Sequence, residues 1–235
     1  MSRLGFELLC GQVLEALPAA PATVVDAGGG TGQLAVALAR HGYRVTVVDT
    51  SAAMLATCAQ RAADAGGQVA ARVAIVQGDA ADLPDLLGPG GQEAAVCHDL
   101  LTRVDDRAAL LASLAGVLAP GGVLSLGFAN RDWLALRAGR RGDHAAALRA
   151  VRGGEAMTLA EAETELDKAG FELVAASGVG VFTDTGDDLD QGEWATLVEL
   201  ERLVAGREPY RSSARTLHLI ARRRVFRPEL TGYTP

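Results

Sequence analysis

A glycine-rich turn near the start of the chain is the segment with the clearest chemical meaning. An apolar run ends at Asp26, Gly28, Gly30 and Gly32 follow, and an amphipathic run begins at Gln33. Glycine adopts positive φ angles at little cost and has no side chain to keep a ligand away from the backbone amides. A strand, a tight turn and a helix in this order predict a site for a nucleotide-derived ligand, with a purely structural turn as the alternative.

Two other phosphate-binding patterns fit this segment poorly. The dinucleotide pattern G-x-G-x-x-G needs a glycine where Gln33 stands. The Walker pattern needs a lysine, and the single lysine of the chain is Lys168. The next apolar run ends at Asp49, whose carboxylate can accept hydrogen bonds from both hydroxyls of a ribose. The alternative role for Asp49 is to cap a helix that starts around Ser51.

Strand-like and helix-like patterns alternate through the first half of the chain and recur near its end. The expected strands cover residues 23–26, 43–49, 72–77, 94–98, 123–128, 171–182 and 216–221. The clearest expected helices cover residues 4–17, 106–118, 158–169 and 189–205. Near-continuously apolar strands that alternate with helices predict an α/β fold with a parallel sheet covered on both faces. Residues 131–152 are expected to form an insertion with one short helix.

Charge is distributed unevenly along the chain. Taken over the whole chain, the net charge of −7 argues against a nucleic-acid-binding protein. Residues 131–152 nevertheless hold six arginines against two acids, and residues 207–227 hold seven against Glu208, whereas residues 155–201 hold thirteen acids and one lysine. If the two basic segments flank one cleft, they can contact the phosphates of tRNA. The alternative is that the two basic segments are ordinary solvent-exposed surfaces without a ligand.

Length and composition limit the class of protein. With 235 residues, 49% of them hydrophobic, the chain suits one α/β domain and excludes a peptide scaffold or a multidomain assembly. Cys10, Cys58 and Cys97 lie far apart without metal-ligand spacing, so we expect buried thiols in a cytoplasmic protein, and no metal. The chain has no apolar run of about 18 residues and no signal-peptide pattern, so we expect no membrane association. No obligate protein partner is expected either.

Four motifs follow one another over about residues 24–128: DAGGGTG, VVDTSAAML, GDAADL and LAPGG. Together they resemble class I S-adenosylmethionine-dependent methyltransferases. Later segments, GGVLSLGFAN, AGFELVAASGVGVF, LVELERLVAGREPY and RTLHLIARR, resemble the bacterial tRNA 5-carboxymethoxyuridine methyltransferases. The resemblance implies a Rossmann-like, seven-stranded, mostly parallel sheet with helices on both faces and an antiparallel last strand. It further implies a single domain over residues 1–235, with a cofactor-binding core over about 1–128 and a substrate-recognition insertion over about 130–157.

The resemblance also implies S-adenosyl-L-methionine as cofactor, S-adenosyl-L-homocysteine as product, and a set of binding residues. The glycines would support the methionyl part, Asp49 would bind the ribose, and Asp79 with the two alanines after it would frame the adenine. His98 would lie beside the amino-acid end and the sulfonium, with a merely buried histidine as the alternative. Arg3 would pair with the cofactor carboxylate. The implied cofactor-binding residues are Arg3, Asp26, Gly28, Gly29, Gly30, Asp49, Thr50, Met54, Asp79, Ala80, Ala81 and His98.

On the acceptor side, the implied residues are Arg215, His218, Tyr210 and Asn130. A carboxylate acceptor is ionised at neutral pH, so methyl transfer to it needs orientation and a cation rather than a general base. The planar guanidinium of Arg215 suits such an anion, and a solvated surface arginine is the alternative. The chain departs from the family pattern at Thr216, where an aromatic residue is expected, and at Ala81, where a polar one is expected.

Three functions are consistent with these patterns. The first is a methyltransferase that esterifies the carboxylate of a modified wobble uridine in tRNA by in-line transfer. The second is a small-molecule O- or N-methyltransferase on the same fold, which would act on metabolites without responding to tRNA. The third, from a different class, is a cofactor-binding regulator or an oxidoreductase, which would bind NAD(H) rather than S-adenosylhomocysteine.

Overall fold

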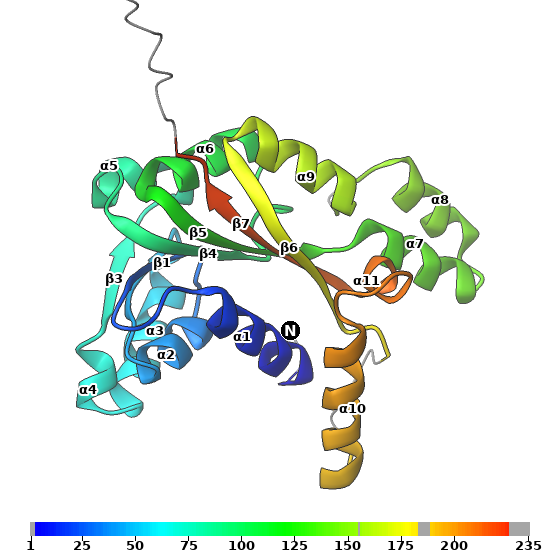
Figure 1. Ribbon diagram of the computed structural model, residues 1–235, viewed down its shortest axis with the longest axis horizontal. Coiled ribbons are helices and arrows are strands. Elements are labelled where there is room, and N and C mark those ends of the chain that lie inside the picture. The colour runs from blue at the N-terminus through cyan, green and yellow to red at the C-terminus, as the bar shows by residue number, and fades with distance from the viewer. Residues whose placement is uncertain (1–2, 155, 183–188, 226–235) are drawn as a thin grey trace, which may run out of the picture.

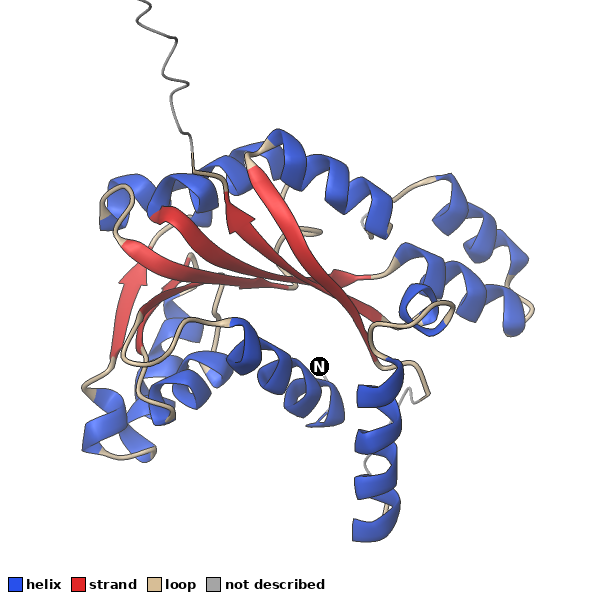
Figure 2. Cartoon of the chain, in the orientation of Figure 1, coloured by secondary structure: helices blue, strands red, loops and turns tan. Residues whose placement is uncertain are grey.

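A computed structural model describes residues 3–154, 156–182 and 189–225 of the protein (Figure 1). These residues form a seven-stranded sheet with helices on both faces (Figure 2). The strands are β1 (Thr23–Ala27), β2 (Arg44–Asp49), β3 (Val73–Gln77), β4 (Gln92–His98), β5 (Leu118–Ala129), β6 (Phe171–Val179) and β7 (Thr216–Arg223). The helices are α1 (Arg3–Ala16), α2 (Gln33–Arg40), α3 (Ala52–Asp64), α4 (Gly67–Ala70), the 3₁₀ helix η1 (Ala80–Asp82), α5 (Leu83–Leu87), α6 (Arg107–Val117), α7 (Arg131–Arg140), α8 (His144–Arg152), α9 (Leu159–Lys168), α10 (Gln191–Val204) and α11 (Tyr210–Ser213).

The strand order across the sheet is β3-β2-β1-β4-β5-β7-β6. The first five strands pair in parallel, and β7 runs antiparallel to both of its neighbours, β5 and β6. This confirms the expected mostly parallel sheet with an antiparallel last strand. As a result, β1 to β6 all end at one edge of the sheet, and β7 begins at that same edge.

Apolar side chains cover the sheet on both faces. On one face α1, α2 and α3 pack through residues such as Val13 and Leu38, which are fully buried. On the other face α5, α6 and α9 pack through residues such as Leu114 and Leu166. Figure 2 shows the two helical layers above and below the strands. For α1 and α6, the apolar spacing along the sequence predicts this buried face.

The segment 131–152 differs from the expected single short helix. It forms two helices, α7 and α8, which pack on each other. Each helix has its own start signal, because the side chain of Asn130 accepts a hydrogen bond from the Asp132 N–H and that of Asp143 accepts one from the Ala146 N–H. All residues of both helices are described, and none is buried. Figure 1 shows this hairpin projecting beyond the sheet.

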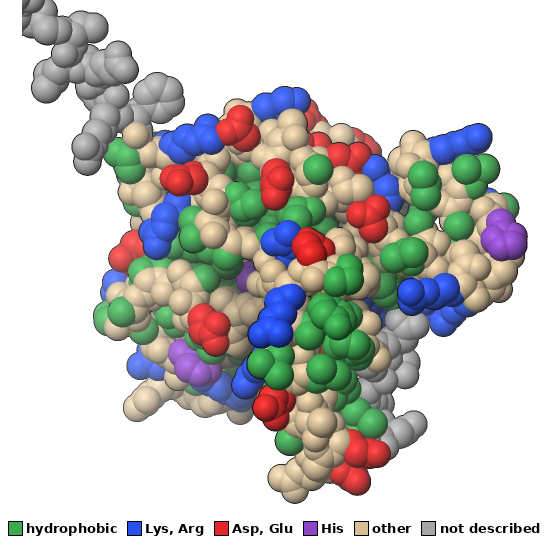
Figure 3. Space-filling model, turned by 45° about the vertical axis from the view of Figure 1, so that its right-hand side comes forward, with side chains coloured by type: hydrophobic (Ala, Val, Ile, Leu, Met, Phe, Trp, Pro, Cys, Tyr) green, Lys and Arg blue, Asp and Glu red, His purple; other side chains and the backbone are tan. Residues whose placement is uncertain are grey.

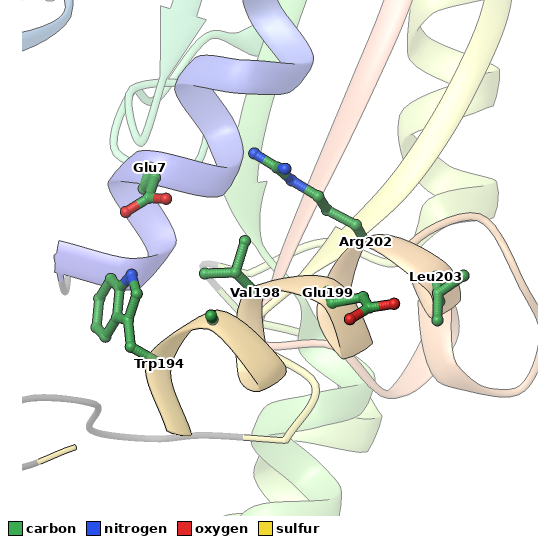
Figure 4. A pocket seen from close by; sticks show the side chains of 7 residues that line it. Glu7, Trp194, Val198, Glu199, Arg202 and Leu203 are labelled. Carbon is green, nitrogen blue, oxygen red and sulfur yellow. The ribbon is translucent and has the colours of Figure 1, made fainter. Parts of the chain in front are cut away.

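Near the other end of the described chain, α10 packs against α1. Leu4 and Leu8 of α1 form a small apolar cluster with Val198 of α10. A groove of about 530 Å³ lies along the two helices, with Trp194 and Arg202 of α10 in its wall (Figure 4). The figure shows the guanidinium of Arg202 directed toward α1. These contacts attach α10 to the body of the protein.

Cysteine burial agrees in part with the sequence analysis. Cys58 and Cys97 are fully buried, whereas Cys10 is half-buried, and all three thiols are free. Burial raises the pKa of the Cys97 thiol to about 12. Among the described helices, none combines the length and the apolar character that crossing a membrane requires.

Candidate active site

Four of the expected cofactor-binding segments lie at the edge where the parallel strands end. The glycine turn, residues 28–32, follows β1, Asp49 ends β2, Asp79 follows β3 and His98 ends β4. Because these strands are parallel neighbours, their carboxyl ends lie side by side. The chain changes direction across the sheet between β1 and β4, and open α/β sheets bind ligands at such a switch point.

The glycine turn presents backbone atoms at this edge. Three of its glycines have positive φ angles: Gly28 at 70°, Gly30 at 54° and Gly32 at 68°. The Gly28 N–H donates a hydrogen bond of 2.8 Å to the Val48 carbonyl, which ties the turn to β2. A Cβ atom on Gly29 would lie 2.6 Å from Cγ of Asp26. Both the conformation and the close approach therefore require glycine here.

Gly32→Ala should destabilise the protein because it combines two costs. A Cβ atom at this position would lie 2.2 Å from Sγ of the buried Cys58, and the backbone is left-handed at φ 68°. Overpacking costs about 1–3 kcal/mol and the left-handed conformation about 1–2 kcal/mol. Urea unfolding should therefore show a loss of about 3 kcal/mol. Gly90→Ala is the matched control, since it has the same φ of 68° and no described atom within 4 Å of the new Cβ. An equal loss in both variants would contradict the steric account.

Asp49 connects the glycine turn to the start of α3. Its Oδ2 accepts a hydrogen bond of 2.9 Å from the Gly30 N–H, and its Oδ1 accepts one of 2.9 Å from the Ser51 N–H. The helix cap of α3 is Ser51, whose hydroxyl accepts from the Met54 N–H, so Asp49 is not the cap residue. An ionised carboxylate has about four acceptor positions. Asp49 therefore keeps acceptor capacity for two ribose hydroxyls.

Asp26 is a buried carboxyl group beneath the turn. Its side chain is 5% exposed, and its Oδ2 atom has no hydrogen-bond partner among the described residues. Burial raises the pKa of Asp26 from 3.8 to about 7, and the negative charge of Asp49 adds to this effect. Because the folded pKa lies above the unfolded value, the protonated group stabilises the fold fully below pH 3.8, and this contribution is lost as the pH rises through 7.

Asp26→Asn should therefore change how stability depends on pH. The raised pKa of Asp26 predicts that the unfolding free energy of the wild type falls by about 4 kcal/mol from pH 4 to pH 8, because each unit of pKa difference corresponds to 1.36 kcal/mol. Asparagine does not titrate. The difference in unfolding free energy, variant minus wild type, should therefore increase by about 4 kcal/mol from pH 4 to pH 8. Urea unfolding at both pH values measures the difference. A difference that stays constant with pH would disprove the raised pKa.

Residues expected around the adenine lie on the rim of the same edge. Oδ1 of Asp79 accepts a hydrogen bond of 2.9 Å from the Ala81 N–H and so caps η1. Ala80 is buried, and Ala81 is exposed. Thr50 is exposed and Met54 is 47% exposed, which leaves an apolar side chain uncovered beside the end of β2. The assignment of these five residues to the cofactor stays a prediction.

His98 takes part in a partly buried row of polar side chains, in which Ser125 and His218 are buried and His98 and Gln12 are half-buried. Its Nε2 lies 2.9 Å from Oγ of Ser125, which lies 2.8 Å from Nε2 of His218, whose Nδ1 lies 2.7 Å from Oε1 of Gln12. The two histidines both pair with Gly127 across the sheet, and their rings meet edge to face at 5.5 Å. Burial lowers the pKa of His98 to about 4 and that of His218 well below its usual value. Both rings are therefore neutral at physiological pH.

Two of the residues expected to hold the acceptor have internal partners instead. His218 is 1% exposed, with both ring nitrogens in contact inside the protein. Asn130 is fully buried, and its Nδ2 donates to the carbonyl oxygens of Ser212 and Ala214, while its Oδ1 accepts from the Asp132 N–H. These contacts tie α7 to the segment before β7. The assignment of His218 and Asn130 to the acceptor site stays a prediction.

Arg3 and Tyr210 lie against aromatic rings. The guanidinium of Arg3 lies 4.7 Å from the centroid of the Trp194 ring, on α10. The ring of Tyr210 is 39% exposed and lies 5.8 Å from the ring of Phe182. The described contact of Arg3 is thus with α10, and its pairing with a cofactor carboxylate stays a prediction.

A cavity of about 350 Å³ lies next to His98, where β4, β5 and β6 end and β7 begins. Leu4 of α1 and Trp133 of α7 form part of its wall. Among the described residues that line it, the charged ones are Asp99, Arg103, Arg137 and Arg215. Three guanidinium groups against one carboxylate give the cavity an excess of positive charge, which suits an anionic ligand.

Arg215 is held at this cavity by both its backbone and its side chain. Its N–H donates to the Gly180 carbonyl, and its carbonyl accepts from the Asn130 N–H, both at 3.0 Å. Its guanidinium carbon lies 5.7 Å from the centroid of the Trp133 ring, and that of Arg137 lies 4.9 Å from the same ring. Both distances allow a cation–π interaction. The indole therefore lies beside two of the three arginines.

Sequence reasoning missed four of the residues that line this cavity: Asp99, Arg103, Trp133 and Arg137. Trp133 and Arg137 had a readable signal, because they stand four residues apart in a basic segment and so share one face of a helix. Asp99 had none. Its φ of 58°, in the left-handed region, directs the chain away from β4, and this conformation is unusual outside glycine.

Comparisons with known proteins agree with this geometry. Residues 24–122 match the family described as "Methyltransferase domain". Among curated relatives, the tRNA 5-carboxymethoxyuridine methyltransferase of Escherichia coli (strain K12) is 32% identical over 210 residues, covering 85% of this chain and 79% of that protein. A ubiquinone biosynthesis O-methyltransferase of Xanthomonas campestris pv. campestris (strain B100) is 35% identical over 116 residues, covering 49% of this chain and 46% of that protein.

Solved structures share the fold at lower identity. Magnesium protoporphyrin IX methyltransferase from Synechocystis PCC 6803, solved with bound S-adenosylhomocysteine, has a TM-score of 0.61 and 19% identity, covering 93% of this chain and 81% of that chain. A possible histamine N-methyltransferase from Thermotoga maritima has a TM-score of 0.64 and 18% identity, covering 94% and 90%. The sheet topology, the glycine turn with Asp49 and these similarities together show that the chain belongs to the class I S-adenosylmethionine-dependent methyltransferases, as an enzyme of that family.

Proposed function

We propose that this enzyme methylates the carboxylate of 5-carboxymethoxyuridine at the wobble position of tRNA. The observation that carries the proposal is the cavity beside His98, which is lined by Arg103, Arg137, Arg215 and Trp133 and in which the Trp133 indole lies beside Arg137 and Arg215. A flat aromatic ring suits a base, and guanidinium groups suit a carboxylate. The relative from Escherichia coli that carries this activity in its name spans most of the chain and supports the choice.

The residues at the sheet edge fit S-adenosylmethionine. Asp49 has acceptor positions for the ribose hydroxyls, and a Cβ on Gly30 would meet only the Asp49 Oδ2, at 3.9 Å, so the backbone there is open to a ligand. Burial raises the pKa of Asp26 to about 7, so a cationic ligand bound at the turn would favour its ionised form. We propose the division of the domain that the sequence predicts: residues 1–235 form one unit, with a cofactor core over about 1–128 and a substrate-recognition insertion over about 130–157.

The mechanism requires the protein to orient rather than to remove a proton. S-adenosylmethionine, when bound, supplies a methyl group that is already activated by its positive sulfur. Arg215 would hold the acceptor carboxylate, which is ionised at neutral pH and needs no base. Trp133 would hold the uracil ring, and α7 would keep water out of the cavity. Orientation of this kind can lower the activation free energy by several kcal/mol.

Mass spectrometry of tRNA nucleosides tests the proposal directly. Deletion of the gene should remove the methyl ester of 5-carboxymethoxyuridine and leave the free acid in its place. The purified enzyme with S-adenosylmethionine should restore the ester on that tRNA in vitro. An unchanged content of the ester after deletion would refute the assignment.

The second candidate is a small-molecule O-methyltransferase. The observation in its favour is the similarity to ubiquinone biosynthesis O-methyltransferases over about half of the chain. Methyl transfer to a panel of phenolic and carboxylic metabolites, with no activity on tRNA, would establish it. This outcome would keep the assignment to the family and replace the acceptor.

A further inference from the structure

The cavity of about 350 Å³ beside His98 is called the acceptor cavity. A second cavity adjoins it on the other side of α7. Its volume is about 360 Å³, within the range of about 300–1,000 Å³ typical of ligand sites. Trp133 and Arg137 line both cavities. Leu134 faces the acceptor cavity and Leu136 faces the second one, so α7 forms the wall between them. A ligand bound in one cavity would therefore be a direct neighbour of a ligand in the other.

Aromatic rings stand in the wall of the second cavity. Trp133 comes from α7, and Phe182 comes from the segment after β6. The backbone of Phe182 is fixed, because the buried carboxylate of Glu201 accepts a hydrogen bond of 2.9 Å from its N–H and further ones from the Val181 N–H. The ring itself is 46% exposed. An apolar ring held in an open position is available for stacking on a flat ligand.

Arginine supplies the charge of this cavity. Arg137, Arg140 and Arg141 line it, and among the described residues of its wall none is acidic. Arg140 and Arg141 are exposed and stand at the end of α7, on the hairpin that projects from the body. Figure 3 shows basic side chains on this projecting part of the molecule. Guanidinium groups bind phosphate oxygens through two parallel hydrogen bonds.

We infer that the second cavity binds the nucleotide that adjoins the methylated one in the RNA chain. Its base would stack on Phe182 and Trp133, and its phosphate would contact Arg140 and Arg141. Single-stranded RNA is commonly bound in this way, by base stacking on aromatic side chains and by arginine on the backbone. The inference rests on the proposed function, because it takes the acceptor to be part of an RNA chain.

The test compares two acceptors: the free nucleoside 5-carboxymethoxyuridine, and an anticodon stem-loop that contains it. Phe182→Ala and the double variant Arg140→Gln, Arg141→Gln should each raise the KM for the stem-loop about tenfold, from the loss of one stacked base or its phosphate contact. Methylation of the free nucleoside should stay within about twofold of the wild type. Trp133 and Arg137 are left unchanged, since they also line the acceptor cavity.

The double variant Arg149→Gln, Arg152→Gln is the matched control. It removes the same charge from the same hairpin, on α8, outside the lining of the second cavity. An equal increase of KM in the control would show a general electrostatic effect and overturn the inference. A parallel loss with the free nucleoside would also overturn it, because the cavity would then belong to the acceptor site.

A binding experiment separates this inference from the proposed function. The chain has two tryptophans, so Trp194→Phe leaves Trp133 as the one fluorescent indole. Unmodified oligouridylate should quench that fluorescence, and Phe182→Ala in the same background should weaken the binding about tenfold. If the wild type methylates neither acceptor while this quenching occurs and Phe182→Ala weakens it, the proposed function fails, and the second cavity is a nucleotide-binding site without the assigned place beside a methylated uridine. If oligouridylate does not quench, the subsite fails.

Discussion

Arg215→Ala should lower kcat/KM for the carboxylate acceptor about 10- to 150-fold and leave the affinity for S-adenosylhomocysteine unchanged. The reason is local, because the guanidinium lines the acceptor cavity beside Trp133, whereas the glycine turn and Asp49 lie at the ends of other strands. Hydrogen bonds to charged groups contribute about 1.5–3 kcal/mol, which sets the range. Turnover assays and titration calorimetry measure the two quantities separately.

Two further variants make the Arg215 result interpretable. Arg215→Lys keeps the charge but loses the planar pair of donors, so it should recover only part of the activity. Arg222→Ala removes an arginine from the far end of β7, the strand that Arg215 precedes; its guanidinium contacts the Gly121 carbonyl, and its loss should leave turnover unchanged. Unchanged turnover in Arg215→Ala would mean that this arginine is only a solvated surface residue. A fall in cofactor affinity would place it in the cofactor site.

Asp49→Ala should weaken the binding of S-adenosylmethionine by about 1–3 kcal/mol, roughly 5- to 150-fold. The substitution removes the acceptor for the ribose hydroxyls and also the acceptor that holds the Gly30 N–H. Both losses act on the cofactor site. Calorimetric titration with S-adenosylhomocysteine at neutral pH measures the effect.

Ser51→Ala is the control for the structural role of this segment. Ser51 caps α3, so its loss should cost about 1 kcal/mol of stability and leave the cofactor affinity unchanged. Equal affinity in Asp49→Ala and wild type would mean that Asp49 only ties the turn to α3. A loss of affinity in both variants would point to the geometry of the turn rather than to ribose recognition.

Much of the cofactor half could be predicted because its signals are local. The glycine turn and Asp49 stand directly at the end of an apolar run, Asp79 stands two residues after β3, and parallel strands bring such positions to one edge. The acceptor half depends on contacts between distant segments. His98 and His218 meet only because β4, β5 and β7 are neighbours and because Gly127, between them, has no side chain. A Cβ there would lie 3.0 Å from Cδ2 of His98.

The hairpin shows a different limit of sequence reasoning. The sequence predicts one short helix here, whereas Asp143 caps a second one, and the helices on either side of it bury no residue, so neither faces a core. The groups that line the two cavities are spread over both faces of α7. Their roles could be assigned only once the ends of β5, β6 and β7 were placed around that helix.

The polar row from Gln12 to His98 also has a direction. An amide oxygen only accepts, so the nitrogen of His218 that faces Gln12 must carry the hydrogen. In a neutral ring the other nitrogen then accepts from the Ser125 hydroxyl, which in turn receives the Nε2 hydrogen of His98. Nδ1 of His98 then carries no hydrogen and can only accept a hydrogen bond. One amide in the first helix thus determines that the end of β4 offers an acceptor and not a donor.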